Sequence, residues 1–257
     1  MYFYRDQISG FDDLIKLPDE ITSKMTEKEL IEHTFPNIKQ DNIDMKEFSK
    51  RVIVAPTNKN VDNINDIATK LMHGEAHEIL SSDKIIKDSQ TAFFPTEFLN
   101  RINVSGLPPH KLILKKGQPI ILLRNLNSAN GLCNGTRLIV KNIFNRLLEA
   151  EIAVGAFIGT TIFIPKIPLI PSDTNLPFDF SRYQFPIRSA FCLSINKSQG
   201  QTLDFISIWL GDEDVFTHGQ LYVALSRVSS LKDIKIATNN ENKYTRNVVY
   251  SEVFNNV

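Results

Sequence analysis

Arg227 is the residue of this chain whose type and surroundings best suit chemistry on phosphate groups. It stands near the end of residues 218–228, where the spacing of apolar side chains predicts a mostly buried helix. An arginine held there can present a planar and permanently charged fork to a phosphate that gains charge in a transition state. The stretch therefore predicts an arginine that acts on a phosphoryl group.

Two further junctions between strands and loops suit phosphate binding. Residues 194–203 follow an apolar run and bring polar side chains, a glycine and Lys197 to the end of an expected strand. Backbone N–H groups and a lysine can bind phosphate at such a junction. Thr57 and Asn58 follow the buried strand expected at 51–55 and can cap the next helix. From these residues alone, a helix cap and a phosphate contact are equally good interpretations of Thr57.

The sequence does not contain a complete ATP site. A phosphate-binding loop needs a glycine followed by lysine, and no glycine of this chain is followed by lysine. The acidic end of residues 206–213 is predicted to be a solvated turn, because the phosphate loop that a metal-binding strand would serve is missing. His73 and His77 lack a third ligand, so we expect no metal site. Cys133 and Cys192 have no neighbouring base, so we expect no cysteine nucleophile.

The elements that must position these residues alternate between strand and helix. Strands are expected at 51–55, 205–210 and 234–237, with helices after the first and second of them. This alternation predicts an α/β fold in which the three strands share one parallel sheet. Residues 1–50 carry eleven Asp and Glu against seven Lys and Arg, and we expect them to form a loosely built arm or a linker remnant. Within it, Leu30, Ile31 and Phe35 can form one face of a short helix that ends before Pro36.

A basic segment interrupts this pattern. Residues 98–148 contain no Asp or Glu but eight Lys and Arg. Short strands separated by turns with glycine predict a small inserted barrel; they are expected at 112–114, 119–123, 136–140, 148–154 and 160–164. The basic excess indicates a face that binds a nucleic-acid backbone, and a solvated face without a partner is the alternative.

The composition of the chain excludes several classes of protein. The net charge is zero, which argues against a highly basic, histone-like binder, and two cysteines exclude a disulfide framework. No apolar run is long enough for a membrane span, so no membrane partner is expected. Trp209 is predicted to lie in the core, whereas Phe93, Phe94 and Tyr183 lie near loops and could stack on bases.

Six motifs resemble the C-terminal half of Pif-type (petite integration frequency) DNA helicases, which belong to helicase superfamily 1. The resemblance runs from about residue 17 to residue 254. The motifs are VIVAPTN at 52–58, LPPHKL at 107–112, ILLRNL at 121–126, GLCNGTR at 131–137, INKSQGQT at 195–202 and FTHGQLYVALSRV at 216–228.

The resemblance implies a RecA-like parallel-sheet domain interrupted by a small SH3-like β-barrel. The second RecA-like helicase domain would comprise residues 51–96 and 185–257, and the basic barrel with its connections would comprise residues 97–184. Residues 1–50 would be an acidic linker or a remnant of the first core domain. The rest of that first domain, with its phosphate loop and its Mg²⁺-binding strand, has no counterpart in this sequence.

The resemblance also implies roles for individual residues. Arg227 would be an arginine finger toward ATP. The other nucleotide-binding residues would be Gly200, Gln201 and Gln220. The DNA-binding residues would be Thr57, Asn58, Asn134, Thr136, Lys197, Ser198 and His218, and no residue would bind a metal.

The implied function is the C-terminal portion of an ATP-dependent 5′–3′ DNA helicase. Its partners would be single-stranded, forked or G-quadruplex DNA and a separate first helicase domain. ATP and Mg²⁺ would be cofactors only when that first domain is supplied, and none is expected for this chain alone. In a eukaryote the protein would work in the nucleus or mitochondrion.

Two alternatives remain open at this point. One is a stand-alone module that binds single-stranded nucleic acid without ATPase activity, and its binding would depend strongly on salt. The other is an inactive, truncated chain or a subunit that docks on a partner through an exposed apolar face. The sequence leaves open whether this chain is itself an enzyme.

Overall fold

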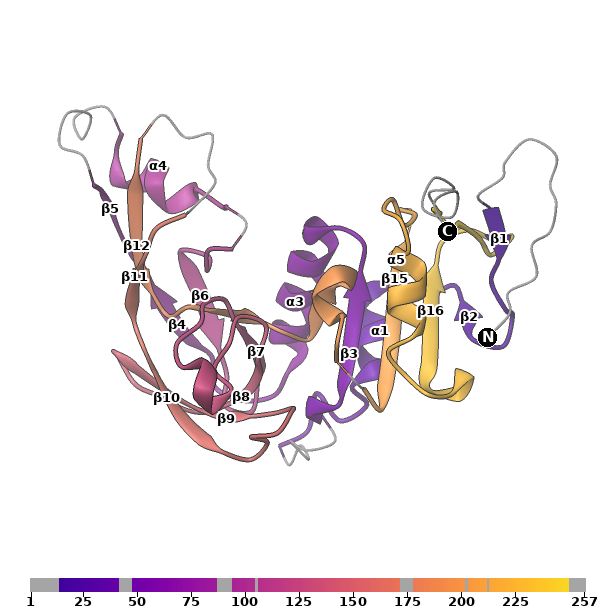
Figure 1. Ribbon diagram of the computed structural model, residues 1–257, viewed down its shortest axis with the longest axis horizontal. Helices are drawn as coiled ribbons and strands as arrows, with labels where there is room; N and C mark the ends of the chain where they lie inside the picture. The colour runs from indigo at the N-terminus through magenta and orange to yellow at the C-terminus, as the bar shows by residue number, and fades with distance from the viewer. Residues whose placement is uncertain are drawn as a thin grey trace. The chain divides into compact units, whose positions relative to one another are not determined.

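The computed structural model describes residues 14–41, 48–86, 94–104, 106–171, 178–201, 203–211 and 213–249. The chain divides into two compact units, drawn in Figure 1. Unit 1 comprises Met1–Gln40, Lys50–Leu71 and Phe191–Val257, and unit 2 comprises Asp41–Ser49 and Met72–Ala190. The sequence placed the corresponding boundaries near residues 97 and 184. None of the described helices is long and apolar enough to cross a membrane.

Unit 1 is built on a five-stranded sheet in the order β14-β3-β15-β16-β2, with all neighbours parallel. Its strands are β2 (Thr22–Ser23), β3 (Arg51–Ala55), β14 (Cys192–Ser194), β15 (Phe205–Gly211) and β16 (Ile234–Thr238). The strands β3 and β15 are buried almost throughout, as expected for parallel strands covered on both faces. The predicted α/β fold with a parallel sheet is confirmed.

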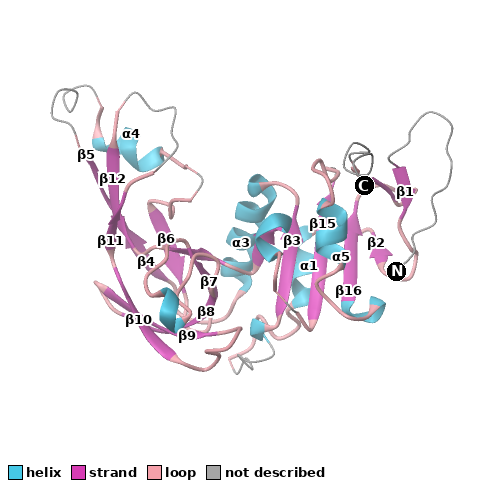
Figure 2. Ribbon diagram, in the orientation of Figure 1, coloured by secondary structure: helices cyan, strands magenta, loops and turns pink. Residues whose placement is uncertain are grey.

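The helices of unit 1 cover this sheet. They are α1 (Glu27–Thr34), α3 (Asn58–Leu71), α5 (Gln220–Leu225) and the 3₁₀ turns η3 (Ile195–Ser198) and η4 (Leu231–Asp233). The helices α1 and α3 pack against each other and against the sheet, and α5 packs against η3. Figure 2 shows these helices in cyan around the magenta strands. The helix α5 is shorter than the predicted 218–228, because it starts after Gly219 in a left-handed conformation and ends at Ser226.

The expectation of a loosely built N-terminal arm is wrong for residues 14–41. The strand β1 (Leu14–Lys16) pairs with β17 (Tyr244–Arg246), and β2 is the edge strand of the main sheet. The helix α1 has a capping box between Thr26 and Glu29. Its apolar residues Leu30 and Ile31 are fully buried. The acidic residues of this segment therefore lie on the outside of an element that packs on the core.

Unit 2 is mostly antiparallel. Its elements are β4 (His77–Leu80), β5 (Ser82–Ile85), α4 (Thr96–Arg101), β6 (Lys111–Leu114), β7 (Pro119–Leu122), η2 (Ser128–Asn130), β8 (Arg137–Ile143), β9 (Leu147–Ile152), β10 (Thr161–Pro165), β11 (Ile167–Leu169), β12 (Phe180–Gln184) and β13 (Ile187–Ser189). The strands form sheets in the orders β10-β9-β8-β7-β13, β11-β12-β5 and β4-β6. The short strands predicted in and after the basic segment are present, with their ends shifted by at most three residues.

Two apolar cores stabilise unit 2. One lies among β6 to β10 and β13, and the other joins α4 to β11 and β12. Beside the second core, Arg182 of β12 forms an ion pair with Asp83 of β5, and both side chains are fully buried. All five N–H donors of Arg182 are used, because the carbonyls of Leu99, Ile102 and Pro108 accept the remainder. This arginine ties the α4 segment to the sheet.

Candidate nucleic-acid interface

The carboxyl edge of the unit 1 sheet gathers most of the predicted site residues. The carboxyl ends of parallel strands meet at one edge, and ligands of open α/β sheets bind beyond that edge. Thr57 follows β3, the turn η3 follows β14, Glu213 follows β15, and Asn239 follows β16. The fold therefore brings segments far apart in the sequence to a common edge.

Thr57 caps helix α3. Its Oγ1 accepts a hydrogen bond of 3.4 Å from the backbone N–H of Asn60, the third residue of the helix. The Thr57 hydroxyl also donates to Glu213 Oε2 at 2.9 Å, and the Asn60 side-chain amide donates to the same oxygen at 2.9 Å. A carboxylate thus lies at the helix N-terminus, where the helix dipole favours negative charge. Asn58 is exposed beside it.

The turn η3 carries Lys197, whose side chain is exposed. Ser198 is fully buried, and its hydroxyl donates to the Ile195 carbonyl at 2.7 Å. In this arrangement the Ser198 hydroxyl supports the turn and is not available to DNA. Gly200 has φ +79°, a left-handed conformation that other residues adopt only with strain. The side-chain oxygen of Gln201 is buried, and no donor for it is found among the described residues.

Arg227 follows α5 directly and remains partly exposed. Its Nε donates to the Val223 carbonyl at 2.9 Å, and its Nη atoms donate to the Gln201 carbonyl at 3.4 Å and the Ser226 hydroxyl at 2.8 Å. These three acceptors are neutral. Within the described part of the chain, no carboxylate pairs with Arg227, and two of its five N–H groups have no acceptor. The guanidinium is therefore oriented by the protein but keeps its full charge for an anion.

Gln220 and His218 lie before Arg227 in the same motif. Gln220 is buried, and its Oε1 accepts from the backbone N–H groups of Phe216 and Thr217 at 3.0 and 3.4 Å. This side chain builds the turn that enters α5 and does not face an open site here. His218 is exposed at the same turn. The turn thus holds His218 outward through a buried glutamine.

The two predicted contacts in unit 2 lie in the loop between β7 and β8. Thr136 Oγ1 donates to the Gly131 carbonyl at 2.7 Å and accepts from the Cys133 backbone N–H at 3.1 Å. Asn134 is exposed in this loop, and its backbone N–H donates to Asn125 Oδ1 at 2.7 Å. Thr136 therefore supports the loop, and Asn134 is the side chain that the loop exposes.

Only some cations of the acid-free run are free to contribute to a basic face, so the nucleic-acid-binding face stays a prediction. Arg137 and Lys115 are buried and donate to the carbonyls of Ser49 and Met72. Loss of hydration on burial lowers the pKa of Arg137 to about 10 and also lowers that of Lys115. Two further lysines are neutralised by acids from outside the run, in the ion pairs Lys111–Glu78 and Lys141–Glu151. Sheet pairing supplies these glutamates, and the charge run could not reveal them.

The cysteines, the metal-ligating residue types and the aromatic residues near loops were also singled out in the sequence. Cys192 is fully buried, and burial raises the pKa of its thiol well above the ordinary value. No group of three or more His, Cys, Asp or Glu side chains that could hold a metal occurs within the described ranges. Among the proposed stacking aromatics, Phe94 packs in the core beside α4, Tyr183 is exposed, and Phe93 lies outside the described residues.

Sequence reasoning missed Glu213 and the Arg182–Asp83 pair. Glu213 belongs to the acidic turn that was predicted to be solvated, and the signal that could have found it is its place at the end of a buried parallel strand. Arg182 and Asp83 lie ninety-nine residues apart, and no local pattern joins them.

Comparisons with known proteins agree with these motifs. The family model described as DNA helicase Pif1, 2B domain, matches residues 97–143. The human ATP-dependent DNA helicase PIF1 is 39% identical over 129 residues, which cover 49% of this chain and 19% of that protein. The chain spans less than half the length of the curated relatives that it matches.

Two solved structures share the fold. The structure of Bacteroides Pif1 bound to single-stranded DNA has a TM-score of 0.58 at 22% identity, covering 90% of this chain and 49% of that chain. A structure of two coordinating Pif1 helicases at forked double-stranded DNA has a TM-score of 0.58 at 24% identity, covering 90% of this chain and 47% of that chain. The family match and the human relative show that this chain is similar to the C-terminal region of Pif1-type DNA helicases, and the two structures show that it shares their fold.

Proposed function

We propose that this chain is the C-terminal part of an ATP-dependent 5′–3′ DNA helicase. It binds single-stranded DNA along the carboxyl edge of its parallel sheet, and Arg227 acts as the arginine finger of an ATP site held mainly by a first core domain. The observation that carries this proposal is the state of Arg227, which three neutral acceptors orient and no carboxylate among the described residues neutralises. Such a guanidinium suits the charge that develops on a transferred phosphoryl group.

The DNA side of the proposal uses the same sheet edge. Lys197 and His218 are exposed, and Thr57 lies at the N-terminus of a fourteen-residue helix. Helix N-termini and lysines are common contacts to a phosphate backbone. Gly200 and Gln201 would approach the nucleotide beside Arg227. Ser198 and Gln220 would act indirectly, because each is buried and holds the turn that presents its neighbours.

Unit 2 would be the SH3-like insertion in a second RecA-like domain, and Asn134 would be its main contact to DNA. The human relative's name describes a DNA helicase, and the two structures contain single-stranded or forked DNA. By extension, the partners of this chain would be single-stranded, forked or G-quadruplex DNA and a separate first helicase domain. Such a protein would work inside the cell, in the nucleus or mitochondrion of a eukaryote.

The residues present do not by themselves fit Mg²⁺ and ATP. The sequence has no phosphate loop, and the described residues include no cluster of acids suited to a metal. The ATP-dependent reaction therefore belongs to the assembled motor. What this chain offers to it is a positioned positive charge at Arg227 and the polar turn 194–203 beside it.

A stand-alone module that binds single-stranded DNA is the second candidate function. The same missing phosphate loop favours it, and it shares the DNA-binding edge with the first candidate. The two functions differ in Arg227, which only the motor needs for ATP hydrolysis.

Salt-dependent DNA binding tests the part that both candidates share. We expect the full chain to bind oligo-dT, and the affinity to fall as salt rises with a slope of about −0.7 per phosphate contact. The Lys197→Ala variant should weaken binding and reduce the slope by about one contact. Lys70→Ala, at the far end of α3, is the matched control and should change neither. Absence of binding, or an affinity that does not change with salt concentration, would overturn the proposed function.

A further inference from the structure

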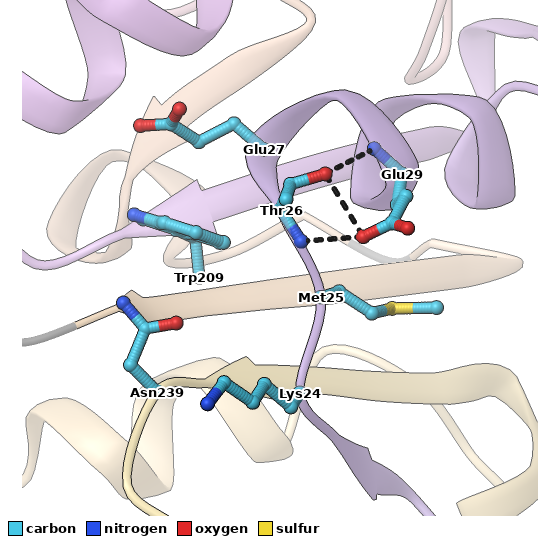
Figure 3. A pocket seen from close by; sticks show the side chains of 7 residues that line it. All are labelled: Lys24, Met25, Thr26, Glu27, Glu29, Trp209 and Asn239. Atoms are coloured by element: carbon cyan, nitrogen blue, oxygen red, sulfur yellow. Dashed lines mark hydrogen bonds between the residues drawn. The ribbon is translucent and has the colours of Figure 1, made fainter.

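A pocket of about 400 Å³ opens at the carboxyl edge of the sheet in unit 1. Its position is defined by the end of β2, the start of α1, Trp209 of β15 and Asn239 after β16. The residues that line it, shown in Figure 3, are Lys24, Met25, Thr26, Glu27, Glu29, Trp209 and Asn239. None of them belongs to the motifs that carry the proposed function. The pocket size is that of a site for a small organic group.

The backbone of β15 is adapted to hold the indole of Trp209. The pairing with β16 shifts register between Trp209 and Gly211, and such a bulge re-aims side chains. Gly211 has φ +54°, and a Cβ added to it would lie 3.0 Å from the indole nitrogen. Only glycine leaves room for the edge of the ring. Trp209 is 7% exposed, which confirms that it is buried.

The indole nitrogen remains unused although the side chain is more than nine-tenths buried. Within the described part of the chain, no acceptor bonds to the Trp209 N–H. The nitrogen is not one of the fully buried polar atoms that lack a partner, so it is accessible from the pocket and can donate to water or to a ligand there. In Figure 3 the Glu27 carboxylate, the indole nitrogen and the Asn239 amide follow one another along one side of the pocket.

These groups select a neutral, planar, hydrogen-bonding ligand. The indole N–H donates, and the Asn239 amide can both donate and accept. Glu27 accepts from the Asn63 amide through one oxygen at 2.8 Å, which leaves its second oxygen for a further donor. Glu29 is engaged in the capping box, and the lysine of the lining, Lys24, pairs with Glu241 at 3.7 Å. The two carboxylates of the lining therefore disfavour a phosphate inside the pocket. Met25 adds an apolar wall that suits an aromatic ring.

We propose that this pocket receives one base of the single-stranded DNA whose backbone follows the same sheet edge. The inference rests on the proposed function. Thr57 follows β3, and β16 lies two strands away, so the pocket is roughly 10 Å along the edge at a strand spacing of about 4.8 Å. Cytosine, adenine and guanine can donate to Glu27 through an exocyclic amino group, and thymine can donate through its N3–H. The pocket therefore distinguishes a strand with bases from one without bases.

Tryptophan fluorescence tests this directly, because Trp209 is the only tryptophan of the chain. The full chain is titrated with oligo-dC, oligo-dT and an abasic oligonucleotide of the same length, and binding is followed independently by anisotropy of a labelled end. We expect oligo-dC and oligo-dT to change the emission of Trp209 and to bind about tenfold more tightly than the abasic strand, the effect of a hydrogen bond to a charged group. The abasic strand should bind without changing the emission.

Two variants separate the pocket from the phosphate contacts. Glu27→Ala should weaken the binding of oligo-dC and oligo-dT about tenfold and leave the affinity for the abasic strand unchanged. Glu20→Ala, which replaces an exposed glutamate outside the pocket, is the control and should change none of the three affinities. If oligo-dC and oligo-dT bind with unchanged emission and no more tightly than the abasic strand, the pocket inference is wrong while the proposed function stands. If no oligonucleotide binds, both fail.

Discussion

Arg182 in unit 2 and Arg227 in unit 1 show two opposite uses of one side chain. Arg182 is fully buried, its charge is neutralised by Asp83, and each of its five N–H groups has an acceptor. Arg227 is partly exposed, contacts only neutral acceptors and keeps two N–H groups for other partners outside the described contacts. The first arginine stabilises structure, and the second is available for function.

Other cations show the same contrast. In unit 2, Arg137 is buried and Lys141 pairs with Glu151. In unit 1, Lys50 and Lys243 pair with acids, whereas Arg227 contacts only neutral acceptors among the described residues. The count of basic residues in a segment is thus a poor guide to where phosphate binds. The pairing state of each cation is the better guide.

Breaking the buried pair should produce the largest effect on stability. Arg182→Met leaves Asp83 buried without a counter-charge, which costs about 3–5 kcal/mol. Urea unfolding followed by circular dichroism measures the change. The double variant Arg182→Met with Asp83→Leu should recover much of that loss. Lys141→Met, in the half-exposed pair with Glu151, is the control in the same unit and should cost less than about 1 kcal/mol. Equal losses in both single variants would contradict the structural role of Arg182.

Glu213 tests whether a carboxylate at the sheet edge of unit 1 opposes the binding of DNA. Its carboxylate occupies the N-terminus of α3 beside Thr57, where the proposed DNA phosphate would bind. Glu213→Gln should therefore raise the affinity for oligo-dT about two- to fivefold, the effect of one charge at a helix N-terminus of about 0.3–1 kcal/mol. Glu20→Gln should leave the affinity unchanged. Weaker binding by Glu213→Gln would show that the carboxylate positions Thr57 for DNA and does not compete with it.

The smallest effect concerns the pH dependence of unit 1. Desolvation lowers the pKa of His33, and Lys235 and Arg51 lower it further. The folded state then binds a proton less readily than the unfolded state. Stability should be constant at high pH and should fall as pH drops through about 6.5, the unfolded value. The decline ends below the lower folded pKa.

Unfolding measured between pH 8 and pH 5 checks this expectation. His33→Gln should flatten the decline, and His77→Gln, at an exposed position on β4, should not. If the stability of the His33→Gln variant falls as steeply with pH as that of the unsubstituted chain, protonation of His33 does not cause the fall.

Most of the framework of unit 1 was predictable from sequence. The strands β3, β15 and β16 and the helix α3 were predicted from the spacing of their apolar residues. The Thr57 cap was one of two equal interpretations, and the Asn60 hydrogen bond confirms it. In the N-terminal segment the short helix with Leu30 and Ile31 on one face is confirmed, whereas its packing on the sheet was not predicted from the acidic composition.

The candidate site was less predictable, because it depends on contacts across the chain. Glu213 meets Thr57 over 156 residues, and Lys141 meets Glu151 through strand pairing. Ser198 and Gln220 belong to the right motifs, but their burial follows from how η3 packs on α5. Motifs locate a site, and packing decides which of its side chains face outward.

ATP turnover measured with Arg227→Ala tests the central claim most directly. The full chain is assayed alone and together with a separately produced first core domain, with and without single-stranded DNA. We expect no turnover by the chain alone, DNA-stimulated turnover by the mixture, and a loss of about 10³-fold or more in Arg227→Ala with DNA binding retained. Turnover by the chain alone, or undiminished turnover in the Arg227→Ala mixture, would contradict the assignment of Arg227 to an ATP site that another domain holds.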